Sequence, residues 1–119
     1  MDKKVRVGVV GLRRGHSLLH DMLFMPEVDI SVICDKDKER LKSCEDWLKY
    51  EKRMDGFVCL DNFEDVLNTD IDAVVIATEV SAHVPMSIQA LEAGKHVLSE
   101  VPAINTLEEA KSLYKAVKK

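Results

Sequence analysis

The first sixteen residues hold the feature that most restricts the fold of this chain. An apolar run, Val5–Val10, stops at a turn that contains Gly11 and Gly15, and a helical pattern begins at Ser17. Apart from Arg6 the run is apolar on both faces, which is typical of a strand inside a covered parallel sheet. A strand that turns through glycines into a helix predicts the first β-α unit of an α/β fold.

The same alternation continues along the chain. Further strands are predicted at 28–34, 57–60, 72–77 and 96–99, and helices at about 17–25, 37–50, 61–67, 84–93 and 107–119. Strands separated by helices of this kind form parallel βαβ units with right-handed crossovers. The prediction is therefore an α/β fold, a doubly wound, Rossmann-like parallel sheet in three α/β/α layers, with ligands at the carboxyl ends of the strands.

Several helix boundaries carry explicit signals. Pro85 is expected in the first turn of its helix, where the missing N–H costs little. Asp61 with Glu64, and Thr106 with Glu109, have the spacing of a capping box.

Composition excludes several classes of protein. The 119 residues are expected to form one domain, and the net charge of −4 does not favour nucleic acid. The amino terminus runs directly into a strand without a signal-peptide pattern, and no apolar run has the length of a membrane span. Three cysteines without a C-x-x-C motif favour reduced thiols and a cytoplasmic protein.

The glycine turn resembles a pyrophosphate-binding turn with departures. G-x-G-x-x-G would place glycines at 11, 13 and 16, whereas this chain has Gly11, Arg13 and His16, with an extra Gly15. The start of a helix offers free N–H groups and the positive end of its dipole to a phosphate. Three interpretations of Arg13 stay open: its guanidinium binds phosphate, it is a solvated loop residue, or the site has lost its cofactor.

Asp35 lies roughly 20 residues after the turn, at the predicted end of the second strand. A carboxylate there can accept hydrogen bonds from the adenosine ribose of NAD, and either Asp35 or Asp37 can cap the following helix. Its charge disfavours the 2′-phosphate of NADP, although Lys36, Lys38 and Arg40 can offset that charge. NAD is favoured, and NADP stays open.

The histidines give weaker signals. His16 and His20 have an i,i+4 spacing that can hold a metal, but no third ligand is evident, so no metal site is predicted. His83 follows the fourth strand, where a contact to a cofactor or adjoining domain competes with a plain role at the helix start.

Longer segments resemble a known family. The segments are D-A-V-V-I-A-T from Asp72, then His83, then A-L-E-A-G-K-H-V-L-S-E from Ala90, together with Gly11, Cys34-Asp35 and Glu39-Arg40. They resemble the N-terminal domain of the glucose–fructose oxidoreductase, inositol dehydrogenase and rhizopine-catabolism (Gfo/Idh/MocA) family over essentially the whole chain. The resemblance implies a nicotinamide-dependent dehydrogenase (oxidoreductase) acting on sugars, polyols or related compounds, whose C-terminal domain supplies the substrate pocket and usually the oligomer interface.

By position, the resemblance implies cofactor contacts along the whole crevice. Gly11, Leu12, Arg13 and Arg14 would face the pyrophosphate, Asp35 the adenosine ribose, Ala77, Thr78 and His83 the nicotinamide, and Glu100 the nicotinamide ribose. Lys36, next to Asp35, is also predicted to contact the cofactor. Two departures stand out. The family's E-K-P lysine is Val101, which has no proton to transfer, and the turn after the fourth strand carries Glu79. No catalytic residue is assigned.

The expectation is a dinucleotide-binding domain over residues 1–119 without the C-terminal substrate domain, and hence not an active enzyme alone. It would bind NAD, and a sugar-like substrate only together with the second domain, with homo-oligomerisation left open and no nucleic acid or membrane partner. Two alternatives are a non-enzymatic, nucleotide-sensing regulatory module and the cofactor domain of an NAD-dependent glycosidase.

Overall fold

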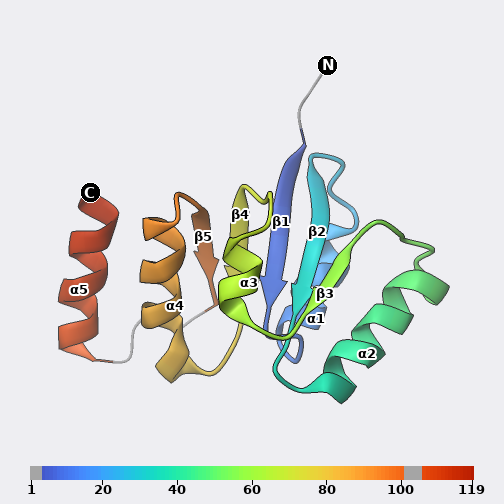
Figure 1. The fold of residues 1–119 in the computed structure, drawn as a ribbon, viewed down its shortest axis with the longest axis horizontal. Coiled ribbons are helices and arrows are strands. Elements are labelled where there is room, and N and C mark those ends of the chain that lie inside the picture. Colours follow the sequence, from blue (N-terminus) through green and yellow to red (C-terminus); the bar gives the residue numbers. More distant parts are fainter. Residues whose placement is uncertain (1–3, 101–105) are drawn as a thin grey trace.

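The computed structural model describes residues 4–100 and 106–119, and its centre is a five-stranded sheet. All neighbouring strands pair in parallel, in the order β3-β2-β1-β4-β5 (Figure 1). The strands are β1 Val5–Val10, β2 Val28–Cys34, β3 Val58–Leu60, β4 Ala73–Ile76 and β5 His96–Ser99. The order reverses direction between β1 and β4, which makes their carboxyl ends the topological switch point of the sheet.

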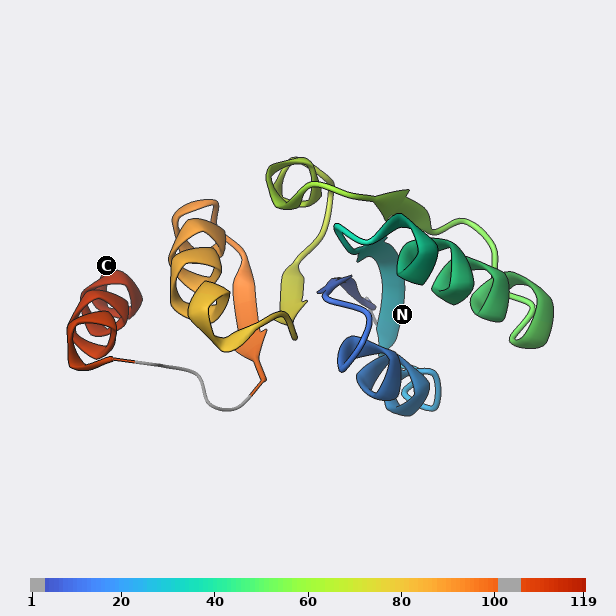
Figure 2. The same cartoon turned by 90° about the horizontal axis from the view of Figure 1, so that it is seen from below.

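Helices cover both faces of the sheet, as predicted for a doubly wound fold. They are α1 Gly15–Met22, α2 Lys38–Asp46 with its π-helical continuation η1 Trp47–Glu51, α3 Phe63–Leu67, α4 Val80–Glu92 and α5 Leu107–Lys118. Figure 2 shows the sheet from its carboxyl end, with α3 and α4 on the opposite side from α1. The Rossmann-like α/β prediction is confirmed.

Two apolar clusters, one on each face, hold the layers together. Leu19 of α1 and Leu48 of η1 pack with Val9 in one cluster, whereas Val66 of α3 packs with Val10 in the other. Neighbouring residues of β1 thus point to opposite faces, and both are almost completely buried. The double-sided burial explains why β1 reads as a continuous apolar run.

The first helix, α1, begins at Gly15, two residues before the predicted start at Ser17, and two further helix-start predictions are wrong. α4 begins at Val80, so Pro85 lies inside the helix and not in its first turn. The proline favours a later start, whereas the structure has a further turn of helix before it, which includes the buried His83. α3 is capped by Asn62, whose side chain accepts the N–H groups of Glu64 and Asp65, and not by Asp61. The predicted cap at Thr106 is confirmed, because its hydroxyl accepts the Glu109 N–H.

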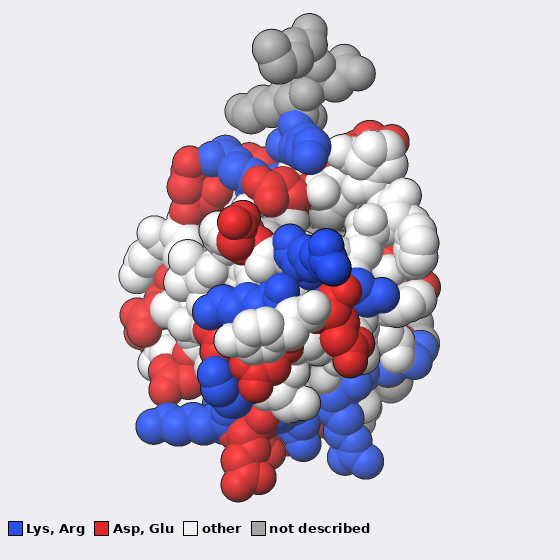
Figure 3. Space-filling view, turned by 90° about the vertical axis from the view of Figure 1, so that its right-hand side faces the viewer, with Lys and Arg blue, Asp and Glu red and all other residues white. Residues whose placement is uncertain are grey.

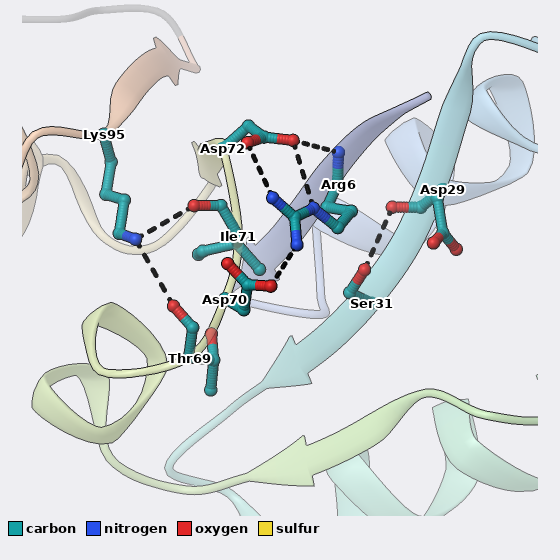
Figure 4. A network of polar contacts seen from close by, with 8 residues as sticks. All are labelled: Arg6, Asp29, Ser31, Thr69, Asp70, Ile71, Asp72 and Lys95. Carbon is teal, nitrogen blue, oxygen red and sulfur yellow. Dashed lines mark hydrogen bonds and ion pairs between the residues drawn. The ribbon is translucent and has the colours of Figure 1, made fainter. Parts of the chain in front are cut away.

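At the amino ends of the strands, charged side chains are held by one another and by the backbone (Figure 4). Arg6 lies between two carboxylates: it makes ion pairs with Asp70 and with Asp72, and Asp72 also accepts the Arg6 backbone N–H at 2.9 Å. Lys95 donates to the carbonyl oxygens of Ile71 at 2.9 Å and Thr69 at 3.3 Å. These contacts join β1, β4 and the start of β5 (Figure 4).

The surface mixes both signs of charge. On the side of the molecule that carries α2, lysine and arginine alternate with aspartate and glutamate (Figure 3). None of the helices that the structure describes combines the length and the apolar composition that crossing a bilayer requires.

Candidate functional site

A cavity of about 620 Å³ opens at the carboxyl ends of β1, β2, β3 and β4. It lies where the sheet order reverses, the place where open α/β sheets bind ligands. Its lining residues are Val10, Gly11, Arg13, Arg14, Cys34, Asp35, Lys36, Arg40, Asp61, Asn62, Phe63, Ala77, Thr78, Glu79 and Met86.

The two glycines of the turn have separate physical roles. Gly11 has a φ of +90°, and a Cβ there would lie 2.6 Å from the Ala77 carbonyl oxygen. Gly15 is the first residue of α1, and a Cβ on it would lie 3.0 Å from Val9 Cγ1. Gly11 therefore lets the chain leave β1 against β4, and Gly15 lets α1 pack closely on β1.

Arg13 and Arg14 fit the turn without strain. Among the non-glycine residues that the structure describes, Arg53 alone has a positive φ, and Arg14 is right-handed helical with a φ of −76°. Both arginines line the cavity. The Cβ of Arg13, at a position where the fingerprint has glycine, therefore does not require an unfavourable backbone.

The start of α1 leaves backbone donors available. The Leu12 N–H donates to Asp35, the Gly15 N–H to Gly11 O, and the Ser17 N–H to Arg14 O. The N–H groups of Arg13, Arg14 and His16 have no acceptor within residues 4–100 and 106–119. Such donors, at the positive end of a helix and beside two arginines, suit a diphosphate.

Asp35 ties the turn to the end of β2. Its Oδ2 accepts the Leu12 N–H at 2.9 Å and Arg40 Nη1 at 3.4 Å, and its Oδ1 accepts the Asp37 N–H at 2.8 Å. The residue is 7% exposed. Each carboxylate oxygen accepts about two hydrogen bonds, so one position on Oδ1 is open to a ribose hydroxyl. The cap of α2 is Asp37, which accepts the Glu39 and Arg40 N–H groups.

Two further ion pairs join different strand ends at the cavity. Lys36 Nζ, after β2, lies 3.7 Å from Glu79 Oε1, after β4. Arg14 Nε, at the start of α1, lies 3.4 Å from Glu100 Oε2, after β5.

The structure brings together most of the predicted site residues and places three elsewhere. Gly11, Arg13, Arg14, Asp35, Lys36, Ala77 and Thr78 line the cavity. The side chain of Leu12 is buried in the core, and its N–H donates to Asp35. Glu100 is not among the lining residues but forms an ion pair with Arg14, which is. His83 is 1% exposed, and its Nε2 lies 2.7 Å from the Thr78 carbonyl, so it holds the β4–α4 turn. Cofactor contacts of these residues stay predictions, and Val101 lies outside the described residues.

Sequence reasoning missed the contribution of the third strand. Asp61, Asn62 and Phe63 follow β3, and Met86 comes from α4. The rule that ligands bind at carboxyl ends of strands applies to β3 as well, so the first three residues had a usable signal. No sequence signal pointed to Met86, because its position at the cavity depends on where α4 begins.

Neither the paired histidines nor Cys34 offers reactive chemistry. His16 and His20 lie against Trp47, with ring centroids 4.1 and 6.2 Å away. Within the described ranges no group of three histidine, cysteine, aspartate or glutamate side chains is arranged to hold a metal. Burial, assisted by the nearby Asp35 charge, raises the pKa of Cys34 to about 12.

The sheet order, the glycine turn at the first helix and the carboxylate at the end of β2 define a dinucleotide-binding domain of the Rossmann type. Residues 5–119 match GFO_IDH_MocA, the oxidoreductase family with an NAD-binding Rossmann fold. The chain belongs to this family and forms its NAD-binding domain.

Similar proteins include enzymes of two kinds. A glycosyl hydrolase family 109 protein of Solibacter usitatus is 33% identical over 112 residues, which are 88% of this chain and 26% of that protein. Apo scyllo-inositol dehydrogenase from Lactobacillus casei has a TM-score of 0.85 at 26% identity, covering 99% of this chain and 34% of the other. The WlbA dehydrogenase from Bordetella pertussis, in complex with NADH and UDP-GlcNAcA, has a TM-score of 0.83 at 27% identity. This match covers 99% of this chain and 33% of the WlbA chain. The chain thus spans about a quarter to a third of these relatives.

Proposed function

We propose that this chain is the cofactor-binding domain of an oxidoreductase that acts on sugars, polyols or related compounds. The observation that carries the proposal is the cavity at the switch point. Arg13, Arg14 and Asp35 line it, and the start of α1 beside it has three N–H groups without an acceptor in the described residues. When bound, NAD supplies a nicotinamide ring that accepts or returns a hydride. The chain covers 34% of the length of the scyllo-inositol dehydrogenase, and we infer that the substrate pocket lies in a part corresponding to the remainder.

Within this proposal the turn holds the diphosphate. The N–H groups of Arg13, Arg14 and His16 bind it through the positive end of α1, and the Arg13 guanidinium adds a charged donor. Asp35 orients the adenosine ribose through the free position on Oδ1. Thr78 and Ala77, at the end of β4, face the other half of the cofactor.

Calorimetric titration of the chain with NAD tests the proposal. We expect binding at sub-millimolar concentration, and we expect Arg13→Gln to weaken it about tenfold, since charge-assisted hydrogen bonds contribute about 1.5–3 kcal/mol. Lys118→Gln is the matched control: it removes one positive charge from α5, which lies at the opposite edge of the sheet from α2 (Figure 1). No binding at millimolar NAD would refute the cofactor role, and undiminished binding by Arg13→Gln would refute the diphosphate contact.

A second candidate is an NAD-dependent glycosidase, which the 33% identity to a glycosyl hydrolase family 109 protein favours. The two candidates share the cofactor site and differ in the fate of the reduced cofactor. With the natural polypeptide that contains this chain, a dehydrogenase would produce NADH in proportion to product from a sugar or polyol. A glycosidase would release 4-nitrophenol from a 4-nitrophenyl glycoside without net NADH.

A further inference from the structure

Two of the cations that line the cavity, Lys36 and Arg40, follow Asp35 in the chain, and both are already paired. Lys36 Nζ lies 3.7 Å from Glu79 Oε1. Arg40 lies 3.4 Å from Asp35 through Nη1 and 3.7 Å from Asp37 through Nη2. Arg13 and Arg14 of the glycine turn also line the cavity, but the Arg13 guanidinium is assigned above to the diphosphate and Arg14 is paired with Glu100. Lys36 and Arg40 are therefore the cations left for a ligand group beside Asp35.

Carboxylates outnumber these two cations. Asp35, Asp61 and Glu79 line the cavity with Lys36 and Arg40, and Asp37 pairs with Arg40 beside it. A ribose 2′-hydroxyl is neutral and can donate to Asp35, whereas a 2′-phosphate carries about −1.5 to −2 charge at pH 7. A phosphate here would compete with Glu79 for Lys36 and with Asp37 for Arg40.

We propose that Glu79 and Asp37 determine cofactor choice: by neutralising Lys36 and Arg40 they make the site select a dinucleotide with a free 2′-hydroxyl. The inference rests on dinucleotide binding at this cavity. Asp35 alone does not settle the choice, because Arg40 is the kind of side chain that accommodates a 2′-phosphate. Glu79 follows β4 as the N-cap residue of α4, and Asp37 follows β2 as the N-cap residue of α2, so the selection depends on contacts between separate strand ends.

Both carboxylates can be neutralised without disturbing the fold. Glu79 is the N-cap residue of α4 but makes no side-chain capping hydrogen bond, and two thirds of its side chain is exposed. Asp37 caps α2 through Oδ1, a role that asparagine fills equally well. Glu79→Gln and Asp37→Asn therefore remove charge and keep shape.

The test is the ratio of NADP to NAD dissociation constants, measured by calorimetry on the chain at low salt. We expect the chain to prefer NAD, each single variant to tighten NADP about three- to fivefold, and the double variant about tenfold, with NAD changed less than about twofold. In about 0.5 M NaCl the gain should shrink, because the pairs are exposed to solvent. Glu108→Gln, on α5, removes the same charge far from the cavity and should leave the ratio unchanged.

The outcomes separate this inference from the function on which it rests. If NAD and NADP both fail to bind, the cofactor role is refuted and the selectivity with it. If NAD binds and the double variant keeps the original ratio, the selectivity is refuted and the cofactor role stands. The selectivity is also refuted if the unmodified chain binds NADP as tightly as NAD. It is refuted as well if Glu108→Gln tightens NADP binding as much as the cavity variants do. Circular dichroism of each variant confirms folding, and the two single variants serve as independent tests.

Discussion

The two ends of this sheet treat charge in opposite ways. At the amino end, Arg6 is held by Asp70 and Asp72, and Lys95 by two backbone carbonyls (Figure 4). At the carboxyl end, N–H groups of the α1 start lack acceptors within the described ranges, and Asp35 keeps one acceptor position open. The polar groups at the amino end thus bind one another, whereas those at the carboxyl end are arranged around a cavity.

The difference follows from the direction of the chain. In a parallel sheet each helix that follows a strand starts at the carboxyl edge, so the positive helix ends gather there. Substitutions at the amino end should therefore change stability alone, and those at the carboxyl end should change ligand binding.

The largest effect should come from Gly11→Ala, which combines two penalties. Its φ of +90° is unfavourable for alanine, and the new Cβ would lie 2.6 Å from the Ala77 carbonyl oxygen. We expect a loss of about 3 kcal/mol or more in the free energy of unfolding, measured by urea denaturation. Gly56→Ala is the matched control: φ is +79°, and nothing lies within 4 Å of the added Cβ, so about 1 kcal/mol is expected. Equal losses would mean that the contact with β4 is not what requires Gly11.

Asp35→Asn tests the carboxyl end directly. An asparagine has one acceptor oxygen, so it cannot serve the Leu12 and Asp37 N–H groups and a ribose hydroxyl together. We expect NAD affinity to fall about tenfold or more, with a loss of about 1–2 kcal/mol in stability, since the residue is buried. Affinity equal to the original, measured by calorimetry, would remove Asp35 from the ribose site.

The same substitution at the other end, Asp72→Asn, should reverse the pattern. It weakens the pair with Arg6, so the melting temperature should fall by a few degrees. NAD affinity should stay within about twofold, because Asp72 precedes β4 and lies at the end of the strand opposite the cavity. A loss of NAD affinity like that of Asp35→Asn would break the division between the two ends.

The contrast between the two ends also explains what the sequence could predict. Strands buried on both faces leave apolar runs such as Val5–Val10, so the sheet and the positions of Gly11 and Asp35 follow from the pattern. Ion pairs between different strand ends cannot be predicted in this way, since no local sequence signal joins Lys36 to Glu79 or Arg14 to Glu100. His83 illustrates the limit: its place after β4 left a cofactor contact and a role at the helix start both open, and its burial became clear only with the start of α4 at Val80.

The smallest effect concerns the thiols. Burial raises the pKa of Cys34 to about 12 and that of Cys59 to about 11, so both are almost wholly protonated at pH 8. Only the thiolate reacts with iodoacetamide, and we expect slow labelling, with Cys59 faster because it is less buried. Cys34 lines the cavity, so NAD should slow its labelling further and leave the Cys59 rate unchanged, as followed by peptide mass spectrometry. Equal protection of both thiols would indicate general stabilisation by NAD, and protection of Cys34 alone would localise the cofactor to the carboxyl end.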